Sequence, residues 1–440
     1  MLTSCAADEE IQNEASNPES EEKDEIITTD FDLIGAIDNG EENEVITIPK
    51  GTYVIDNQLL LKSGMSLTGE GTDKTKIIAS DDWDPGTAKL PNDGVNSDVE
   101  DKNAYLIVLS HGTKGVKISN MMLSGPKSHG AIFGNNCDGL IVDNLYIKEF
   151  LWSGIRTFRM ENAEIRNSTF ENAGGKHGNI TGGGLYLTWT KDSDFYNNIF
   201  FRSGDQSRPF YGIKGREGRN CRIHNNTILV NFSIEFPHEN DHNMEIDHNY
   251  MTGTVSIPKF GGGGVPDSGI TFNIHHNYFS ASYALEWARN GTEVHHNLFD
   301  FSTDKDGGNL ISCWTEISPG PTKFHDNLIK NPGRGVFWSE HVFNNYEFYN
   351  NHVIANTTTT PRSEGLFGFD KDTDFSTISI RNNIIECKGL SRPLMRNNNS
   401  YNADISNNTL INISDTAEYT NMNANSPKGP NEQLYFPMWC

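Results

Sequence analysis

The segment GIKGREGRNCRIHNNTILVNFSIEFPHENDHNMEIDHNY, residues 212–250, contains the same unit twice. Each unit begins with a small residue and a short β-rich run, GIKGRE from Gly212 and SIEFPH from Ser233. Each ends in an asparagine-containing pair, NN at Asn225 and HN at His248. Asparagine tolerates left-handed turns, and its amide can stack on the rung below. The repetition therefore predicts a solenoid of stacked coils.

Related units of about 20 to 30 residues recur along the chain. Similar runs start at Gly154, Gly184, Ser256, Ala284 and Gly335, and similar turns follow at Asn197, His276, His296, Asp326, Asn350, Asn382 and Asn407. They amount to roughly a dozen imperfect rungs in an all-β fold. Because histidines replace asparagine in several turns, the pattern favours turn or ladder roles over metal binding for His224, His248, His275, His276, His295 and His296.

The stretch ITIPKGTYVIDNQLLLKSGMSLTGEG, from Ile46 to Gly71, resembles the opening rungs of pectate-lyase-like proteins. The resemblance implies a right-handed parallel β-helix with an N-terminal cap over residues 31–415, preceded by a tether (1–30) and followed by a tail (416–440). Carbohydrate lyases, hydrolases, epimerases and phage tailspikes share this fold, so the resemblance specifies the fold better than the reaction.

The 440 residues carry a formal net charge of −24, which argues against a nucleic-acid partner. Acidic residues crowd the stretch from Asp8 to Asp32, a composition typical of a disordered tether. Just before it, Leu2–Ala6 resembles the end of a bacterial lipoprotein signal, and the acidic run resembles the export signal of Bacteroidetes surface lipoproteins. This resemblance implies lipidation of Cys5 and a monomer at the cell surface or in the periplasm, held to the outer membrane by its lipid. No later segment is apolar enough to span a bilayer.

The other cysteines show no CxxC spacing, so neither a zinc site nor a dense disulfide framework is predicted. They are Cys137, Cys221, Cys313, Cys387 and Cys440.

Side chains alternate along a strand, so the rungs can be aligned by their inward apolar residues. With Ile155, Leu187, Ile213, Ile234, Ile257 and Leu285 facing the core, an outward column contains Arg156, Tyr186, Lys214, Glu235, Pro258 and Glu286. A second column contains Phe158, Thr188, Arg216, Pro237, Phe260 and Ala288. Rungs lie about 4.8 Å apart, which places Lys214 beside Glu235, with His238 at the end of the same strand.

Basic residues around these columns predict a groove for an anionic glycan, such as a uronate-containing or sulfated polysaccharide. Aromatic side chains can stack on sugar rings there. The predicted substrate-binding residues are Arg156, Tyr186, Trp189, Lys259, Glu286 and Arg289.

The first chemistry that fits is β-elimination at a uronic acid. Lys214 suits the base, His238 is the second proton-transfer group, Glu235 lies beside Lys214, and Arg216 or Arg289 neutralises the carboxylate. The group that leaves C4 could be a sugar chain, as in a lyase, or water, as in a dehydratase. Placement of these residues is similar to that in β-helix alginate lyases and mannuronan epimerases, although Lys214-Gly215-Arg216 stands where an epimerase would carry an acidic motif.

Three alternatives stay open. Glu235 and Glu286 lie two rungs apart, about 10 Å, near the 6.5 to 9.5 Å of an inverting glycosidase pair. Lys214 and Glu235 could instead form an idle surface ion pair, or the coil could bind glycans without catalysis. Asp241, Glu245 and Asp247 are expected to be solvated. They could also bind calcium, which lyases of this fold often use; no other metal or cofactor is predicted.

Overall fold

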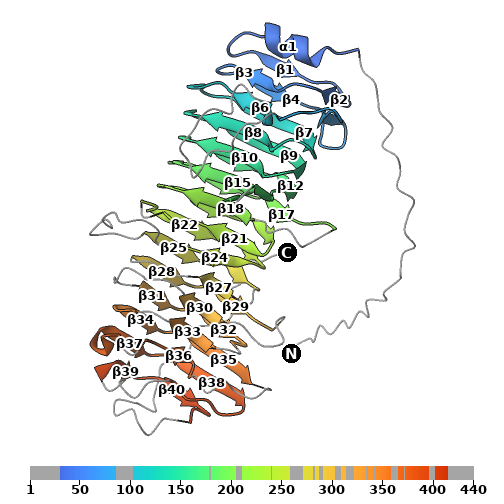
Figure 1. Ribbon diagram of the computed structural model, residues 1–440. Helices are drawn as coiled ribbons and strands as arrows, with labels where there is room; N and C mark the ends of the chain where they lie inside the picture. The colour runs from blue at the N-terminus through green and yellow to red at the C-terminus, as the bar shows by residue number, and fades with distance from the viewer. Residues whose placement is uncertain are drawn as a thin grey trace, which may run out of the picture.

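The computed structural model describes residues 30–85, 103–177, 180–204, 211–238, 240–257, 271–280, 283–286, 291–302, 309–313, 322–332, 335–339, 342–357, 365–370, 372–395 and 402–414. These residues form a right-handed parallel β-helix, which confirms the predicted fold (Figure 1). The predicted tether before residue 30, Cys5 and the tail after residue 415 lie outside the described residues.

Three parallel stacks of strands make the walls of the coil. The first stack pairs in the order β1 (Val45–Thr47), β4 (Ser66–Thr68), β7 (Lys117–Gly125), β9 (Ile141–Phe150), β11 (Glu164–Arg166), β16 (Asp194–Tyr196), β19 (Arg222–His224), β22 (Met244–Asp247), β25 (Phe272–His275), β28 (Thr292–His295), β31 (Thr322–His325), β34 (Tyr346–Tyr349), β37 (Ile378–Arg381) and β39 (Asp404–Ser406).

The second stack shares the long strands β7 and β9 with the first. Its other members are β2 (Gly51–Ile55), β5 (Thr75–Ala79), β12 (Thr169–Ala173), β17 (Ile199–Phe201), β20 (Thr227–Leu229), β23 (Tyr250–Met251), β26 (Tyr278–Phe279), β29 (Leu298–Asp300), β32 (Leu328–Lys330), β35 (His352–Thr357), β38 (Ile384–Gly389) and β40 (Thr409–Ile411).

The third stack is a separate 12-stranded sheet. It runs β3 (Leu59–Leu61), β6 (Tyr105–Leu109), β8 (Gly130–Asn135), β10 (Ser153–Phe158), β15 (Gly183–Thr188), β18 (Tyr211–Arg216), β21 (Phe232–Glu235), β24 (Thr254–Ser256), β27 (Tyr283–Glu286), β30 (Asn309–Cys313), β33 (Gly335–Ser339) and β36 (Phe367–Gly368). A small antiparallel pair, β13 (Lys176–His177) and β14 (Ile180–Thr181), and a 3₁₀ turn, η1 (Phe375–Thr377), complete the elements.

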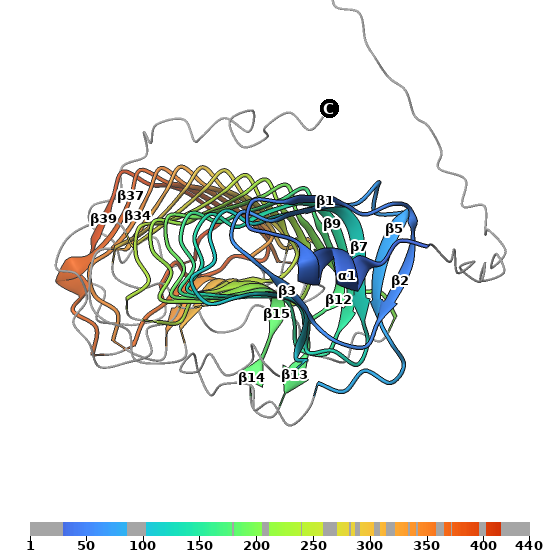
Figure 2. The same ribbon diagram turned by 90° about the horizontal axis from the view of Figure 1, so that it is seen from above.

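A short helix forms the N-terminal cap that the resemblance implied. Helix α1 (Leu33–Asn39) lies across the first rungs when the coil is seen end-on (Figure 2). Asp32 caps it by accepting a hydrogen bond from the backbone N–H of Gly35 at 2.9 Å. Leu33 and Ile37 are buried and continue the core of the coil, so the end of the apolar column is covered.

Paired asparagines turn the chain from the first stack into the second. The first member of each pair adopts a positive φ, as Asn225 does at 53°, and the second points inward. These inward asparagines are at most 2 % exposed and form a ladder made of Asn198, Asn226, Asn249, Asn277, Asn297, Asn327, Asn351, Asn383 and Asn408. Each amide bonds to the amide of the next rung, which satisfies polar groups inside an apolar core. The predicted asparagine stacking is confirmed.

The histidines of these turns stack on each other. His275, His295 and His325 have ring centroids 5.0 Å apart from one rung to the next, and His248, His276 and His296 form a second stack. Burial and the neighbouring His325 and His275 lower the pKa of His295 to about 4. Burial and the neighbouring His275 likewise lower the pKa of His276 to about 4. The ladder role predicted from sequence is present.

This stacking predicts a loss of stability in mild acid. The pKa of His295 in the folded chain lies below the ordinary value near 6.5, so the unfolded chain takes up the proton first as pH falls. The contribution of His295 to the free energy of unfolding is therefore complete above pH 6.5. It declines toward pH 4, by about 1 kcal/mol after solvent screening. We expect His295→Asn to lose less thermal stability between pH 7 and pH 4.5 than the unmutated protein, measured by circular dichroism. Substitution of the exposed His111 by Asn should leave the pH profile unchanged; equal profiles for all three proteins would contradict this prediction.

Cys137, Cys221 and Cys387 are buried, and burial raises the pKa of Cys221 to about 12, which makes its thiol unreactive. Among the described residues, no helix is long and apolar enough to cross a membrane.

Candidate functional site on the 12-stranded sheet

The predicted column lies on the outer side of the 12-stranded sheet, with one correction. Successive strands pair Arg156 with Tyr186, Tyr186 with Lys214, and Lys214 with Glu235. The next members are Ser256 and Glu286. Pro258 was therefore assigned wrongly to the column, because Val255, and not Ile257, pairs with the core residue Ile234.

The same error affects one earlier rung. Leu185, and not Leu187, pairs with the core residue Ile155. Both leucines are buried, so the hydrophobic pattern alone did not distinguish them. The second column is confirmed where the sheet continues, since Phe158, Thr188 and Arg216 pair in register.

Lys214 and Glu235 form a close ion pair at the centre of the column. The Lys214 Nζ lies 3.0 Å from Glu235 Oε2, and the side chains are only 17 % and 13 % exposed. The ammonium group also lies 4.6 Å from the ring centroid of Tyr211. Arg216 follows two residues after Lys214 on β18 and is half-buried. Two cations and one carboxylate thus face the same side of the sheet, which suits an anionic substrate with a transferable proton.

His238 follows β21 and lies against a second carboxylate. Its Nε2 is 3.5 Å from Glu217 Oε1, and its Nδ1 accepts a hydrogen bond from the backbone N–H of Asn240 at 3.3 Å. The acceptor role of Nδ1 puts the ring proton on Nε2, toward Glu217. Both side chains are largely buried, with 14 % and 16 % exposed. His238 is therefore oriented as a proton donor.

Asp241 holds the backbone that carries this pair. Its Oδ2 accepts from the N–H of His238 at 2.7 Å, and its Oδ1 accepts from the N–H of Gly218 at 2.6 Å. Asp241 is fully buried, so the expectation that it is solvated was wrong. Glu217 has a φ of 55°, a left-handed conformation that turns the chain sharply after β18. Sequence reasoning missed Glu217 as a site residue; its place in the loop KGREGR, directly after the column, was the available signal.

Arg156 and Tyr186 lie in the column, but their side chains are not open to solvent. Arg156 is 0 % and Tyr186 is 3 % exposed, and Tyr186 packs edge-on against Trp152 with ring centroids 4.9 Å apart. Trp189, at the end of β15, is partly exposed and packs against Phe158 at 4.8 Å. Of the two predicted aromatic platforms, Tyr186 and Trp189, only Trp189 is exposed enough to stack on a sugar ring.

Three predicted site residues cannot be placed in the groove. Lys259 and Arg289 lie outside the described residues, as do Phe260 and Ala288 of the second column. The backbone of Glu286 is described in β27, two strands from Glu235, whereas its side chain is not.

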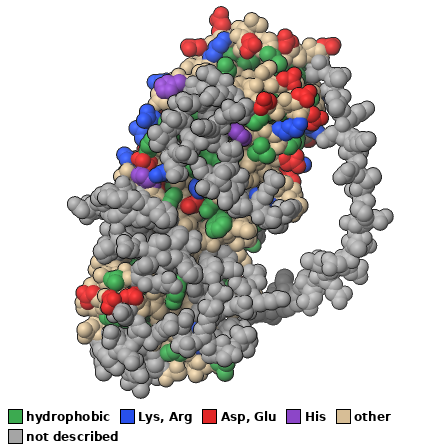
Figure 3. All heavy atoms as spheres, viewed as in Figure 1, with side chains coloured by type: hydrophobic (Ala, Val, Ile, Leu, Met, Phe, Trp, Pro, Cys, Tyr) green, Lys and Arg blue, Asp and Glu red, His purple; other side chains and the backbone are tan. Residues whose placement is uncertain are grey.

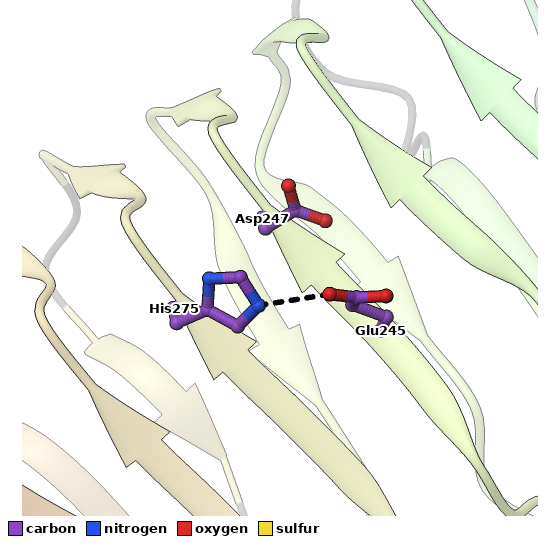
Figure 4. A group of neighbouring side chains, drawn as sticks. All are labelled: Glu245, Asp247 and His275. Atoms are coloured by element: carbon purple, nitrogen blue, oxygen red, sulfur yellow. Dashed lines mark hydrogen bonds and ion pairs between the residues drawn. The ribbon is translucent and has the colours of Figure 1, made fainter. Parts of the chain in front are cut away.

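Glu245, Asp247 and His275 come together on the first stack, as Figure 4 shows. His275 Nε2 lies 3.0 Å from Glu245 Oε1. Asp247 is fully buried, contrary to the expectation of solvation, and both its oxygens are occupied by Arg222, at 2.9 and 2.8 Å. Burial alone would raise the pKa of Asp247, but the hydrogen bonds from Arg222 and His248 lower it overall.

This trio does not fit a calcium ion. Calcium prefers six to eight oxygen ligands, whereas the trio offers a histidine nitrogen and a carboxylate already neutralised by Arg222. A cation placed there would also meet the guanidinium charge. Asp241 does not suit a calcium ion either, since both its oxygens already accept backbone hydrogen bonds.

Charges of both signs surround the N-terminal half of the coil. Figure 3 shows basic side chains interspersed with acidic ones there, despite the acidic composition of the chain. The net charge of the chain therefore does not describe the local potential of this part of the surface.

Comparison with known proteins agrees with this architecture. A family model described as "Right handed beta helix region" matches residues 106–299. The curated proteins give no match. A variant of the tailspike protein of E. coli bacteriophage HK620, solved with a hexasaccharide, has a TM-score of 0.60 and 14% identity over 89% of this chain and 73% of that one.

The PL6 family alginate lyase AlyGC has a TM-score of 0.56 and 11% identity, over 80% of this chain and 50% of the lyase. This chain thus spans about half the length of the lyase. At these identities the likeness concerns the fold alone. Taken with the three stacked sheets, the matches show that the chain has the fold of a right-handed parallel β-helix.

Proposed function

We propose that this protein is an enzyme that cleaves an anionic polysaccharide or oligosaccharide by β-elimination at a uronic acid. One observation carries the proposal. The Lys214–Glu235 pair and the His238–Glu217 pair lie on consecutive strands and the turns that follow them, with Arg216 beside Lys214. Two proton-transfer units and a cation for the substrate carboxylate are what elimination requires.

Each residue has a defined part in the proposed reaction. Lys214 passes a proton to Glu235, at 3.0 Å, and its neutral amine removes the proton from C5 of the uronate. The electron pair of the C5–H bond forms a C4–C5 double bond as the C4–O4 bond breaks. His238 gives its Nε2 proton to O4. Arg216 stabilises the charge that develops on the substrate carboxylate.

The leaving group at O4 determines the class of product. Loss of a sugar chain gives a lyase, and loss of water from a non-reducing-end uronate gives a dehydratase. The structural neighbours support a glycan substrate, since AlyGC is an alginate lyase and the tailspike is bound to a hexasaccharide. The lipid anchor at Cys5 and the location at the cell surface or in the periplasm stay predictions.

Hydrolysis is the second candidate, because the sheet register aligns its two carboxylates. Glu235 pairs with Ser256, and Ser256 pairs with Glu286. Two strand spacings separate the two backbones by about 9 to 10 Å, which side-chain reach can bring into the range of an inverting pair.

The test is to incubate the purified protein with polymannuronate, polygalacturonate and sulfated uronate polysaccharides, and with their oligomers. We expect ultraviolet absorbance to rise on at least one of them, because elimination leaves a double bond conjugated to the carboxylate. New reducing ends without this absorbance would instead indicate hydrolysis by Glu235 and Glu286. Binding of a glycan with neither signal would indicate a binding protein.

A further inference from the structure

Arg156 is a buried cation that has no ion-pair partner among the described residues. Its side chain on β10 is 0 % exposed, and none of its three guanidinium nitrogens has a hydrogen-bond partner. Buried arginines in proteins are normally paired, because transferring a charge out of water is very unfavourable. A contribution to the stability of the fold therefore does not explain why an arginine occupies this position.

Aromatic rings surround the guanidinium group. Its central carbon lies 5.0 Å from the ring centroid of Trp152 and 5.7 Å from those of Phe133 and Tyr186. The rings attract a cation through their π-faces, but they offer no oxygen for its N–H groups. Apolar and aromatic walls with a few fixed polar groups are typical of ligand sites.

Further buried polar groups beside Arg156 make no hydrogen bond of good geometry. Tyr105 Oη, Ser153 Oγ and Trp152 Nε1 are buried, and none of them makes a hydrogen bond of good geometry. Burial raises the pKa of Tyr105, while the charge of Arg156 and weak hydrogen bonding with the side chains of Ser153 and Arg156 oppose that shift, so the phenol lies beside both. All four side chains can donate hydrogen bonds, and the group contains no carboxylate. Such a set of donors is complementary to an oxyanion.

We propose that Arg156, with Tyr105, Ser153 and Trp152, binds one carboxylate or sulfate ester of the glycan. The inference rests on the proposed function, whose substrate class it specifies. Arg156 and Lys214 are separated by Tyr186 in the column, two strand spacings or about 9 to 10 Å. One sugar ring does not span that distance, so the anion held by Arg156 belongs to a different sugar from the one that reacts. Because Arg156 is fully buried, the ligand reaches it only after a local opening.

Thermal unfolding distinguishes a binding role from a structural one. Arg156→Met removes the unpaired charge and keeps an apolar chain among the rings, so its unfolding midpoint is expected to equal or exceed that of the unmutated protein. The matched control is Arg222→Met, which breaks the ion pair with the buried Asp247 and should lower the midpoint. A drop with Arg156→Met as large as with Arg222→Met would assign Arg156 to the core and overturn the proposal.

Binding provides the direct test. Lys214→Met, alone and combined with Arg156→Met, is titrated calorimetrically with a tetramer of mannuronate, its carboxyl-reduced form and a sulfated galactan tetramer. We expect Arg156→Met to raise the dissociation constant of one of the two anionic ligands by at least about 30-fold and to leave that of the neutral tetramer unchanged. Which anionic ligand responds distinguishes a carboxylate from a sulfate site. Trp152 fluorescence should change on binding, because its ring lies against the guanidinium.

The outcomes separate this inference from the proposed reaction. Binding that depends on Arg156, without any ultraviolet signal in the unmutated protein, would support the subsite and contradict elimination. An ultraviolet signal whose KM and kcat are the same in Arg156→Met would support elimination and overturn the subsite. The subsite is also overturned if neither anionic tetramer binds in a way that depends on Arg156.

Discussion

Replacement of Asn277 by alanine is expected to destabilise the rungs around it by about 3 to 5 kcal/mol. Asn277 is 1 % exposed and sits in the middle of the asparagine ladder. Its Nδ2 donates to the carbonyl oxygens of Ile246 and His275 and to Oδ1 of Asn297. Its Oδ1 accepts from the backbone N–H and the Nδ2 of Asn249. Alanine removes all of these bonds and leaves buried donors and acceptors without partners.

Hydrogen exchange followed by mass spectrometry suits this measurement, because a stack of repeats can open locally. Peptides covering β22, β25 and β28 should exchange faster in Asn277→Ala, while peptides from the first rungs should change little. The matched control is Asn273→Ala on the same β25. Asn273 is partly exposed, and its Oδ1 contacts His295 Nε2 at 2.9 Å. We expect a cost of about 1 kcal/mol or less there. Equal protection in the two variants would show that the ladder does not carry local stability.

Sequence patterns predicted the parts of the fold that depend on local chemistry. The NN and HN pairs identified the left-handed turn, as at Asn225, and the stacking of asparagine amides, which the structure assigns to the inward second residue, as at Asn226. Both properties belong to the asparagine side chain and recur from rung to rung, so the repetition allowed them to be predicted from the sequence. The pairing of Lys214 with Glu235 followed from the short spacing between consecutive rungs.

Register was less predictable, because inward residues are not confined to the strands. Val255 and Ile257 are both buried, and the alternation rule cannot tell which of them pairs with Ile234. The pairing of β21 with β24 also contains an irregularity between Phe232 and Ile234, which shifts the register by one residue. Pro258 lies two residues after Ser256, the true partner of Glu235, so this irregularity accounts for one of the two residues of the error, and the choice of Ile257 over Val255 completes it.

The burial of charged groups could not be predicted either. Alternation placed Arg156 on the outer side of its strand, which is correct, but exposure depends on the neighbouring rings of Trp152 and Tyr186. Asp241 is buried because two backbone N–H groups converge on its carboxylate across a turn. Such convergence is a tertiary property, and a pattern of acidic residues in a turn does not reveal it.

Substitution of Lys214 by methionine is expected to lower kcat of the proposed elimination by about a thousandfold. Methionine has a similar length but lacks the nitrogen that accepts the C5 proton. KM should change much less, because the loss concerns a group that acts in the transition state. Glu235→Gln keeps a polar side chain beside Lys214 yet cannot take its proton, and we expect a loss of about a hundredfold. The measurement is the initial rate of ultraviolet absorbance on the best substrate of the panel.

Lys214→Arg separates a proton-accepting role from an electrostatic one. Arginine keeps the positive charge beside Glu235 but stays protonated at working pH, so it cannot act as a base. If Lys214 is the base, Lys214→Arg is as inactive as Lys214→Met; if Lys214 only binds the substrate anion, arginine restores most of the activity. Arg381→Met is the matched control, since it breaks an ion pair of 2.7 Å with Glu347 on the first stack, away from the column. Its rate should stay within about twofold of the unmutated protein, and full activity in Lys214→Arg would remove Lys214 from the base role and leave His238 as the candidate.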